Sequence, residues 1–426
     1  MRTRSSSVPG AGLEPREVSL ACAVLLCMTV AFAVLQVTGI PGGSAAVRTE
    51  HVGADFAEFY VAGKILNEYG AASLYDLDLQ TRLFRSLEPG NKDSSLWYVC
   101  APHLAAIFRP FALLPYRAAF LAWWVVSILI FGVGLCALGP YLRCLPEPHR
   151  KAAILLGLSF APFALWSFVG GQIGAIAFAI IAWCVRFDLS GKHVAAGATL
   201  ALCCYKPSLL LLFGPFLLVR MNLRLLLGFG AGLGGIFAFS TLAAGPKAVS
   251  DWLALMSTYG RFSSGGTTPW PAAWPLLIDL NHFVRRIVGS DQHLPVLVAG
   301  AAFVAVVLAL ARHWRGFDKA TAEERQITWA VTITASLVAN LYVMTYDSVS
   351  LVAGAVLTAA VLCRRGQEVM PARHFHAIVA LVWVTALVPP PVIAFLRVHV
   401  YTLAIVALAV FQYGLLRRLS RLRTES

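Results

Sequence analysis

The sequence is short of charge. Asp, Glu, Lys and Arg make up only 13% of its 426 residues and apolar residues make up 58%, whereas water-soluble domains carry about 25% charged residues. A soluble fold cannot bury that much apolar surface, so the composition predicts an all-α polytopic membrane protein. The apolar segments are continuous and lack the alternating polarity of membrane strands, which excludes an outer-membrane barrel.

Motifs of several other classes are also missing. The chain has no nucleotide-phosphate loop, no HExxH zinc motif and no GxSxG nucleophile elbow, which argues against an ATP-driven pump and a serine hydrolase. The nine cysteines show no metal-ligand spacing, and Cys100 alone lies in a long loop, so no disulfide framework is predicted. No cofactor is predicted, and dependence on a metal ion stays open.

What the sequence does contain is long apolar runs. The first, 19–38, is as long as a full membrane span, which favours an uncleaved first helix over a signal peptide. The further runs cover 118–139, 152–168, 173–185, 194–205, 208–219, 225–244, 294–311, 327–344, 348–363, 376–388 and 392–416. They predict about twelve transmembrane helices, with eleven as the alternative, and the short runs indicate helices that end in a protein-lined cavity.

The distribution of basic residues orients the chain. With the N-terminus in the cytoplasm and twelve crossings, the inner segments hold 21 of the 34 Lys and Arg residues, as expected for cytoplasmic loops. Both termini are then cytoplasmic in a multi-pass protein of the cell membrane. The net charge of +13 thus indicates lipid headgroups and not a nucleic-acid partner.

This topology makes a specific demand on the run 194–219. It must form two short helices that reverse direction at Lys206-Pro207, because otherwise the later loops would change sides. Proline disfavours helical backbone in the residue before it, which supports a turn at this point.

Two long outer loops result, at about 39–117 and 245–293. The first contains GADFAEFYVAGKILNEYGAASLY and a short helical stretch at 77–87, and the second begins with a surface helix at 247–259. Loops of this length are usually either functional or disordered. We expect interfacial helices in both loops, packed on the outer face of a single integral domain over residues 1–426.

Four polar residues from separate parts of the chain reach the outer surface in this topology: Asp55, Gln172, Lys206 and Asp347. Each also has a structural explanation. Asp55 and Glu58 form a D-x-x-E pattern typical of a helix cap, and Asp347 is expected to cap the helix that follows it. Gln172 sits in a glycine turn, and Lys206 can extend to the lipid interface.

His103 and Arg109 flank a short apolar stretch in PHLAAIFRPFALLP. The stretch is too brief to cross a membrane, so a re-entrant or interfacial segment would keep both side chains near the headgroups. Taken singly, each residue fits a structural role better than a functional one.

Several stretches of the sequence match one family pattern in order. DFAEFYVAGKILNEYGAASLYD fits a D-x-x-x-[FY]-Y-x-A-G…LY-[DE] signature, and the further matches are YVCAPHLAAIFRPFALLPYRAAFLAWW, VGGQIGAIAFAI, AAGATLALCCYKPSLLLLFGPFLLVR and NLYVMTYDSVSL. Over about residues 50–350 the chain therefore resembles glycosyltransferase family 87, whose members have the C-type glycosyltransferase (GT-C) fold. The resemblance implies transfer of a hexose, mannose in many relatives, from a polyprenyl-phosphate donor to a lipid or glycan acceptor on the extracytoplasmic side.

The resemblance also implies roles for individual residues. The family's acidic residue in the first outer loop maps onto Asp55, which is then the catalytic base. The residues expected to bind the donor phosphate and sugar are Lys206, Gln172, His103, Arg109 and Tyr60, and Tyr346 with Asp347 forms a further candidate site. Gly174 and Ser208 stand where many relatives have asparagine and glutamine, which leaves the sugar and acceptor preference open.

These residue types suit the chemistry. A sugar hydroxyl is a poor nucleophile, so a carboxylate must accept its proton during attack on the anomeric carbon. The leaving lipid phosphate needs cations and hydrogen-bond donors, which Lys206 and either Arg109 or His103 can supply. The hypothesis is a single displacement with inversion and with Asp55 as general base.

Two other functions stay open. A transporter or lipid flippase is the main alternative, although transporters usually carry ionisable residues at mid-membrane and internal repeats, and neither is evident in this sequence. A non-catalytic membrane scaffold, in which Asp55 only caps a helix, is the second alternative.

Overall fold

The computed structural model describes residues 14–38, 53, 55–87, 96–262, 275–289, 293–365 and 370–425. Parts of the two expected outer loops, 39–52, 54, 88–95, 263–274 and 290–292, lie outside the described residues. Within the described part the regular elements are all helices, and Leu277 and Met344 form one isolated antiparallel bridge.

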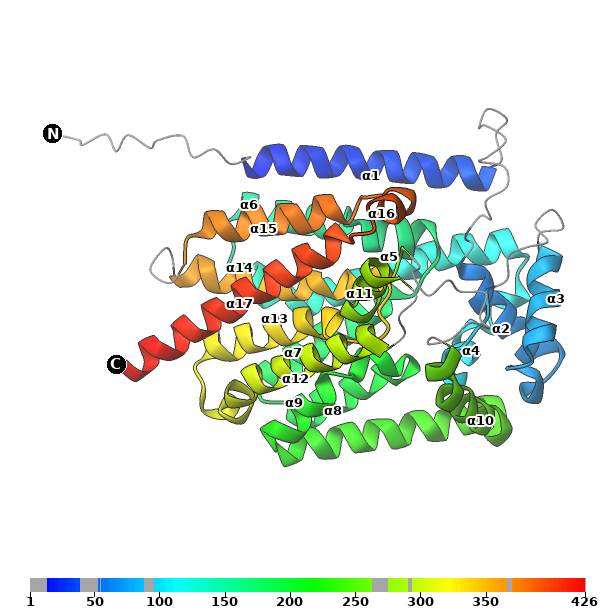
Figure 1. Cartoon of the computed structure of the whole chain (residues 1–426). Helices are drawn as coiled ribbons and strands as arrows, with labels where there is room; N and C mark the ends of the chain where they lie inside the picture. Colours follow the sequence, from blue (N-terminus) through cyan, green and yellow to red (C-terminus); the bar gives the residue numbers. More distant parts are fainter. Residues whose placement is uncertain are drawn as a thin grey trace.

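The elements follow one another along the chain as Figure 1 shows. The first half contains α1 (Pro15–Thr38), α2 (Phe56–Glu68), η1 (Ala71–Ser73), α3 (Leu77–Leu87), α4 (Pro102–Phe108), η2 (Phe111–Leu113), α5 (Tyr116–Leu142), α6 (Glu147–Leu158), η3 (Pro162–Val169), α7 (Gly174–Leu189), α8 (His193–Ala201), η4 (Leu202–Tyr205), η5 (Pro207–Leu210) and α9 (Phe213–Arg220). The second half contains α10 (Leu223–Phe262), α11 (Leu280–Val288), α12 (His293–Arg315), η6 (Phe317–Lys319), α13 (Ala322–Val338), η7 (Thr345–Ser350), α14 (Leu351–Arg365), α15 (Ala372–Thr385), α16 (Pro390–Leu396) and α17 (Val400–Glu425).

The helices have the lengths and composition of membrane spans. In the part of the chain that the structure describes, six stretches are long and apolar enough to cross a membrane, namely those of α1, α5, α10, α12, η7 with α14, and α17. The bent pairs α6–η3 and α15–α16 raise the number to eight if each pair is one span. The protein is therefore an all-helical polytopic membrane protein, as predicted, whereas the number of twelve crossings stays a prediction.

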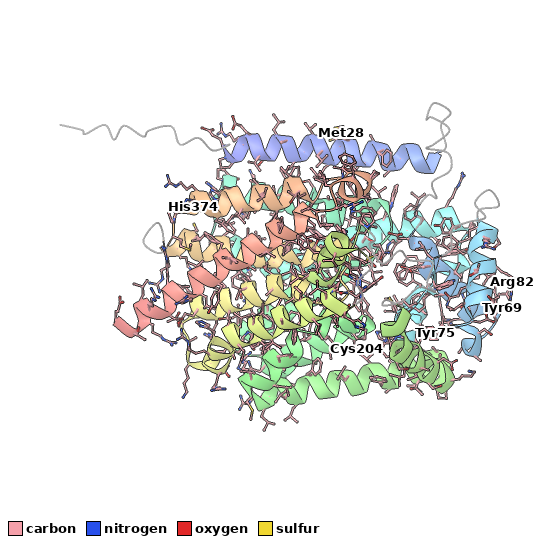
Figure 2. All side chains as sticks on the ribbon, viewed as in Figure 1. Met28, Tyr69, Tyr75, Arg82, Cys204 and His374 are labelled. Atoms are coloured by element: carbon pink, nitrogen blue, oxygen red, sulfur yellow. The ribbon has the colours of Figure 1, made fainter. Side chains whose placement is uncertain are left out.

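The long helices form a layered body with two distinct ends. α1 lies along one side against α6, and α10 lies along the opposite side against α8 (Figure 1). α2, α3 and α4 gather at one end with the last part of α10, while the C-terminus lies toward the other end (Figure 1). Figure 2 shows Tyr69, Tyr75 and Arg82 at the α2–α4 end and His374 at the far end.

Several apolar runs differ from the helices they predicted. The run 152–168 is divided between α6 and η3, which are bent by 43°. The run 327–344 is helical only to Val338, and its last residues are extended because the backbone of Val343 and Thr345 pairs with residues 276–278. The run 392–416 contains two helices, since Arg397 ends α16 in the left-handed region with φ 56°. The helical stretch predicted at 77–87 is confirmed as α3.

The predicted reversal at Lys206-Pro207 is confirmed. Lys206 has φ −137° and ψ 88°, so the helix that begins with α8 stops there and a new one starts at Pro207. Arg220 at the end of α9 returns to the start of α8, where its Nη2 lies 3.5 Å from Nδ1 of His193. The two short helices therefore form a hairpin.

A buried cluster of charges locks the open end of this hairpin. Arg220 donates to Asp188 at 2.8 Å and to Asp318 at 2.6 Å, and its side chain is fully buried. Asp188 also accepts from Nε1 of Trp329 at 2.8 Å and lies 2.8 Å from Nδ1 of His193. The cluster around Arg220 thus links α7, α8, α9, η6 and α13 at the end of the hairpin away from Lys206.

Replacing this arginine tests the cluster. Arg220→Met leaves Asp188 buried without its cation, so we expect a loss of about 3–5 kcal/mol of folding stability, measured as a lower midpoint of thermal unfolding in detergent. Arg224→Met is the matched control, because Arg224 is exposed and exposed substitutions usually change stability by less than about 0.5 kcal/mol. Equal midpoints for the two variants would show that the cluster does not hold the hairpin.

Candidate functional site

The site begins where α2 meets the glycine turn between η3 and α7. The backbone N–H groups of Asp55 and Phe56 both donate to the carbonyl of Gly170 at 3.2 Å. Gly171 has φ 84°, and a Cβ there would lie 2.5 Å from the Cβ of Phe56. Only glycine fits both the left-handed backbone and this close approach. The turn therefore fixes the start of α2 beside Gln172.

The capping interpretation of Asp55 is wrong. Its backbone is in the helical region, and its side chain makes no capping hydrogen bond to α2. Its carboxylate instead forms a hydrogen bond with the side chain of Gln172. Nε2 of Gln172 also donates to Oε1 of Glu58 at 3.3 Å. One glutamine thus holds two carboxyl groups from the first turn of α2.

The two carboxyl groups have raised pKa values. Burial raises the pKa of the Asp55 carboxyl to about 7, and the hydrogen bond with Gln172 offsets part of this shift. Burial, and then the charge of Asp55, raise the pKa of Glu58 well above its usual range, against the opposing effects of Gln172 and Lys206. With its pKa near 7, Asp55 is suited to accept a proton near neutral pH.

The cation of the site is Lys206, at the turn of the α8–α9 hairpin. Its Nζ lies 2.5 Å from Oδ2 of Asp347 in an ion pair that is 13% exposed on the lysine side and 2% on the aspartate side. Asp347 is not the N-cap of a helix but lies inside η7, where its Oδ2 accepts from the N–H of Met344, the N-cap of η7, at 2.8 Å. The ion pair joins the hairpin turn to η7.

Aromatic rings flank this cation. Nζ of Lys206 lies 4.6 Å from the ring centroid of Tyr346 and 5.9 Å from that of Tyr342. The backbone of η7 comes so close to α7 that a Cβ at Gly174 would lie 2.2 Å from the carbonyl oxygen of Tyr346. Gly174 thus has a packing reason: a larger residue would push Tyr346 and Asp347 away from Lys206.

The carboxyl groups and the cation belong to one site. Glu58 interacts electrostatically with both Asp55 and Lys206, and Cys100 interacts with Glu58, Lys206 and Asp347. The structure thus brings together five of the residues singled out in the sequence, namely Asp55, Gln172, Lys206, Tyr346 and Asp347.

Three other candidates have hydrogen-bond partners outside this group. Arg109 is exposed, and its Nε donates to Oδ1 of Asn67 at 2.9 Å. Nδ1 of His103 lies 3.1 Å from Oγ of Ser240 on α10, where burial lowers the pKa of the imidazole to about 4. The hydroxyl of Tyr60 donates to the carbonyl of Leu114 at 2.9 Å. Their roles in binding the donor stay a prediction.

Three residues of the site were not singled out as functional from the sequence. Glu58 was interpreted as part of a helix cap, although its spacing of three from Asp55 already placed both carboxyl groups on one helix face. Tyr342 lies in NLYVMTYD, where its spacing of four from Tyr346 was the available signal. No sequence pattern pointed to Cys100. It lies near Lys206 because the neighbouring residues are hydrogen-bonded: the N–H of Ala101 donates to the carbonyl of Tyr205 at 3.2 Å.

The arrangement can perform acid–base chemistry and hold an anion. Asp55 can accept a proton, Gln172 can donate to an oxygen, and Lys206 can bind a negative charge next to Asp347. Among the residues that the structure describes, no group of three or more His, Cys, Asp or Glu side chains is arranged to hold a metal ion.

Comparison with known proteins gives one match. The model of glycosyltransferase family 87 matches residues 98–345, which include Gln172 and Lys206. Asp55 and Asp347 lie outside the matched region, so their assignment rests on the geometry. No curated protein and no solved structure matches the chain. Because the match covers more than half of the chain, the protein belongs to glycosyltransferase family 87, a family of membrane glycosyltransferases.

Proposed function

We propose that this protein transfers a hexose from a polyprenyl-phosphate donor to a lipid or glycan acceptor at the extracytoplasmic side of the cell membrane. The hexose we propose is mannose. The observation that carries the proposal is the group formed by Asp55, Glu58 and Gln172 beside the Lys206–Asp347 ion pair. A base and an anion-binding cation at one site are what displacement of a phosphate from a sugar requires.

Asp55 acts as the general base. The acceptor hydroxyl gives its proton to the Asp55 carboxylate while its oxygen forms a bond to the anomeric carbon. The bond from the anomeric carbon to the phosphate oxygen breaks, and its electron pair leaves with the polyprenyl phosphate. A single displacement of this kind inverts the anomeric configuration, and Asp55 later releases its proton to water.

Lys206 holds the leaving phosphate. A lysine ammonium has three N–H donors, so it can keep its bond to Asp347 and still donate to a phosphate oxygen. Asp347 is buried and also accepts from the backbone of Met344, which fixes the direction of the ammonium. The charge of Lys206 offsets the negative charge that develops on the phosphate as the bond breaks.

The proposal includes the membrane arrangement. The GT-C fold, twelve crossings and cytoplasmic termini would put the Lys206 turn and α2 outside the membrane on the extracytoplasmic side. The Arg220 cluster at the opposite end of the hairpin would then lie on the cytoplasmic side. In this arrangement residues 1–426 act as one domain.

The first test concerns the base. Asp55→Asn keeps the size of the side chain but cannot accept a proton, so we expect transfer to fall by about 100- to 10,000-fold with an unchanged thermal midpoint. The measurement uses purified protein in lipid, radiolabelled polyprenyl-phosphate-mannose and a membrane lipid extract as acceptor.

A variant on the same helix serves as the control for this test. Glu68→Gln removes an exposed carboxylate that pairs with Lys64 and should leave transfer unchanged. Full activity in Asp55→Asn would remove Asp55 as the base, and movement of lipid across the membrane without transfer would favour the flippase alternative.

The second test is the pH dependence of transfer. The Asp55 carboxyl must be ionised to accept a proton, and its pKa is raised to about 7. Activity should therefore be low at acid pH and rise with pH, with a midpoint near 7 in kcat/KM. A profile that is already flat from pH 5 upward would show that no group with a raised pKa acts as the base.

The third test concerns the cation. Lys206→Met should lower kcat/KM by about 100-fold, the usual effect of removing one electrostatic contact to a developing anion. It also leaves Asp347 buried and unpaired, so stability should fall too. The double variant Lys206→Met/Asp347→Asn removes that penalty and should recover the thermal midpoint but not the activity. Recovery of both would give Lys206 only a structural role.

A further inference from the structure

Two tyrosines lie next to Lys206: Tyr342 in the segment that precedes η7, and Tyr346 inside η7. Several hydrogen bonds hold the segment with Tyr342. Residues 340–345 lead from the end of α13 into η7. Asn340 donates to the carbonyl of Ser208 at 2.8 Å, and the N–H of Val343 donates to Oδ2 of Asp279 at 3.0 Å. Ile278 and Leu276 add backbone bonds to Val343 and Thr345 at 2.9 and 2.8 Å. These hydrogen bonds hold the backbone on both sides of Tyr342, and so they fix the position of its ring.

The ring of Tyr342 also packs against His282. The two rings lie edge to face, with centroids 6.0 Å apart and an interplanar angle of 76°. Nδ1 of His282 lies 2.9 and 3.0 Å from the two carboxylate oxygens of Asp279, which is fully buried. Asp279 thus fixes the orientation of His282 and the backbone after Tyr342 at the same time. Asp279 is also the N-cap of α11, but that role alone does not explain its contacts with His282 and Val343.

Tyr342 and Tyr346 both lie beside the cation of the site. Both rings flank Lys206, which would hold the phosphate, and both side chains are only half-buried. Tyr346 also interacts electrostatically with Asp55 and Glu58, the groups that would face the acceptor. In the proposed reaction the anomeric carbon lies between the phosphate and the base, which would bring the transferred sugar next to these rings.

We propose that Tyr342 and Tyr346 form the subsite for the transferred sugar and that His282, held by Asp279, is a positioning residue for Tyr342. This inference rests on the proposed function. A pyranose has an apolar face of C–H groups, which packs on an aromatic ring, and a rim of hydroxyl groups, which need polar partners. The two tyrosines supply the ring faces, and Gln172 and the carboxyl groups supply the partners.

The competing explanation is that the rings only stabilise Lys206 through cation–π contacts. The two explanations differ in what is lost when Tyr342 is removed. A sugar subsite affects binding of the sugar-bearing donor but not of polyprenyl phosphate, which lacks the sugar. A contact that serves only Lys206 affects both lipids equally.

The experiment compares the KM for polyprenyl-phosphate-mannose with the inhibition constant of polyprenyl phosphate of the same chain length. Tyr342→Ala should raise the KM by about tenfold, as expected for loss of one aromatic contact, and leave the inhibition constant unchanged. Tyr342→Phe should restore the KM, and His282→Asn should raise it in the same direction by a smaller factor. Tyr69→Ala is the matched control, since Tyr69 is an exposed tyrosine at the α2–α4 end (Figure 2).

The possible outcomes separate the two proposals. If both constants rise together in Tyr342→Ala, or if neither changes, the sugar subsite is wrong while transfer by the wild type still supports the proposed function. If the wild type transfers no sugar from any polyprenyl-phosphate donor, the proposed function fails and the subsite with it. Thermal midpoints are measured for every variant, and Tyr342→Leu replaces Tyr342→Ala if the latter does not fold.

Discussion

The ion pair between Lys206 and Asp347 is the interaction on which the site depends. Two charges that are 13% and 2% exposed cannot be left unpaired at low cost, so the hairpin turn and η7 must stay together. The pair sits at a break in the helix caused by Pro207, which frees the lysine from the helical backbone. η7 also packs against the start of α7 at Gly174, next to the glycine turn. The position of that turn then sets the positions of Gln172 and of the carboxyl groups on α2.

A second charge cluster balances the first at the far end of the hairpin. Arg220 lies between Asp188 and Asp318 and closes the open end of α8 and α9. Charges within a membrane protein are stable only when they are paired or functional. In this protein one cluster is fully satisfied by its own partners, whereas the other keeps carboxyl groups with raised pKa values beside a cation. That difference separates the structural cluster from the functional one.

The family and the geometry contribute different parts of the functional argument. The family match shows a membrane glycosyltransferase and includes Lys206 and Gln172, but it begins after Asp55 and ends before Asp347. The assignment of a base therefore depends on the raised pKa of Asp55 and on its place beside Gln172. The sugar subsite depends on two rings that flank Lys206.

The sequence by itself determined the class of the protein and the hairpin at Lys206-Pro207. Composition decides whether a chain can be soluble, and the proline effect is local, so neither needs tertiary structure. The topology expected from the apolar runs also predicted that Asp55, Gln172, Lys206 and Asp347 share one side of the membrane.

Only the tertiary structure decided what these residues do to one another. The spacing of Asp55 and Glu58 predicted a helix cap. In the structure the N–H of Asp55 donates to the carbonyl of Gly170 and that of Ala57 to the carbonyl of Gly53, and both carboxyl groups bond to Gln172. His103 and Arg109 fit the same motif as the site but face Ser240 and Asn67. Side-chain partners depend on which distant elements pack together, and that information is not contained in local spacing.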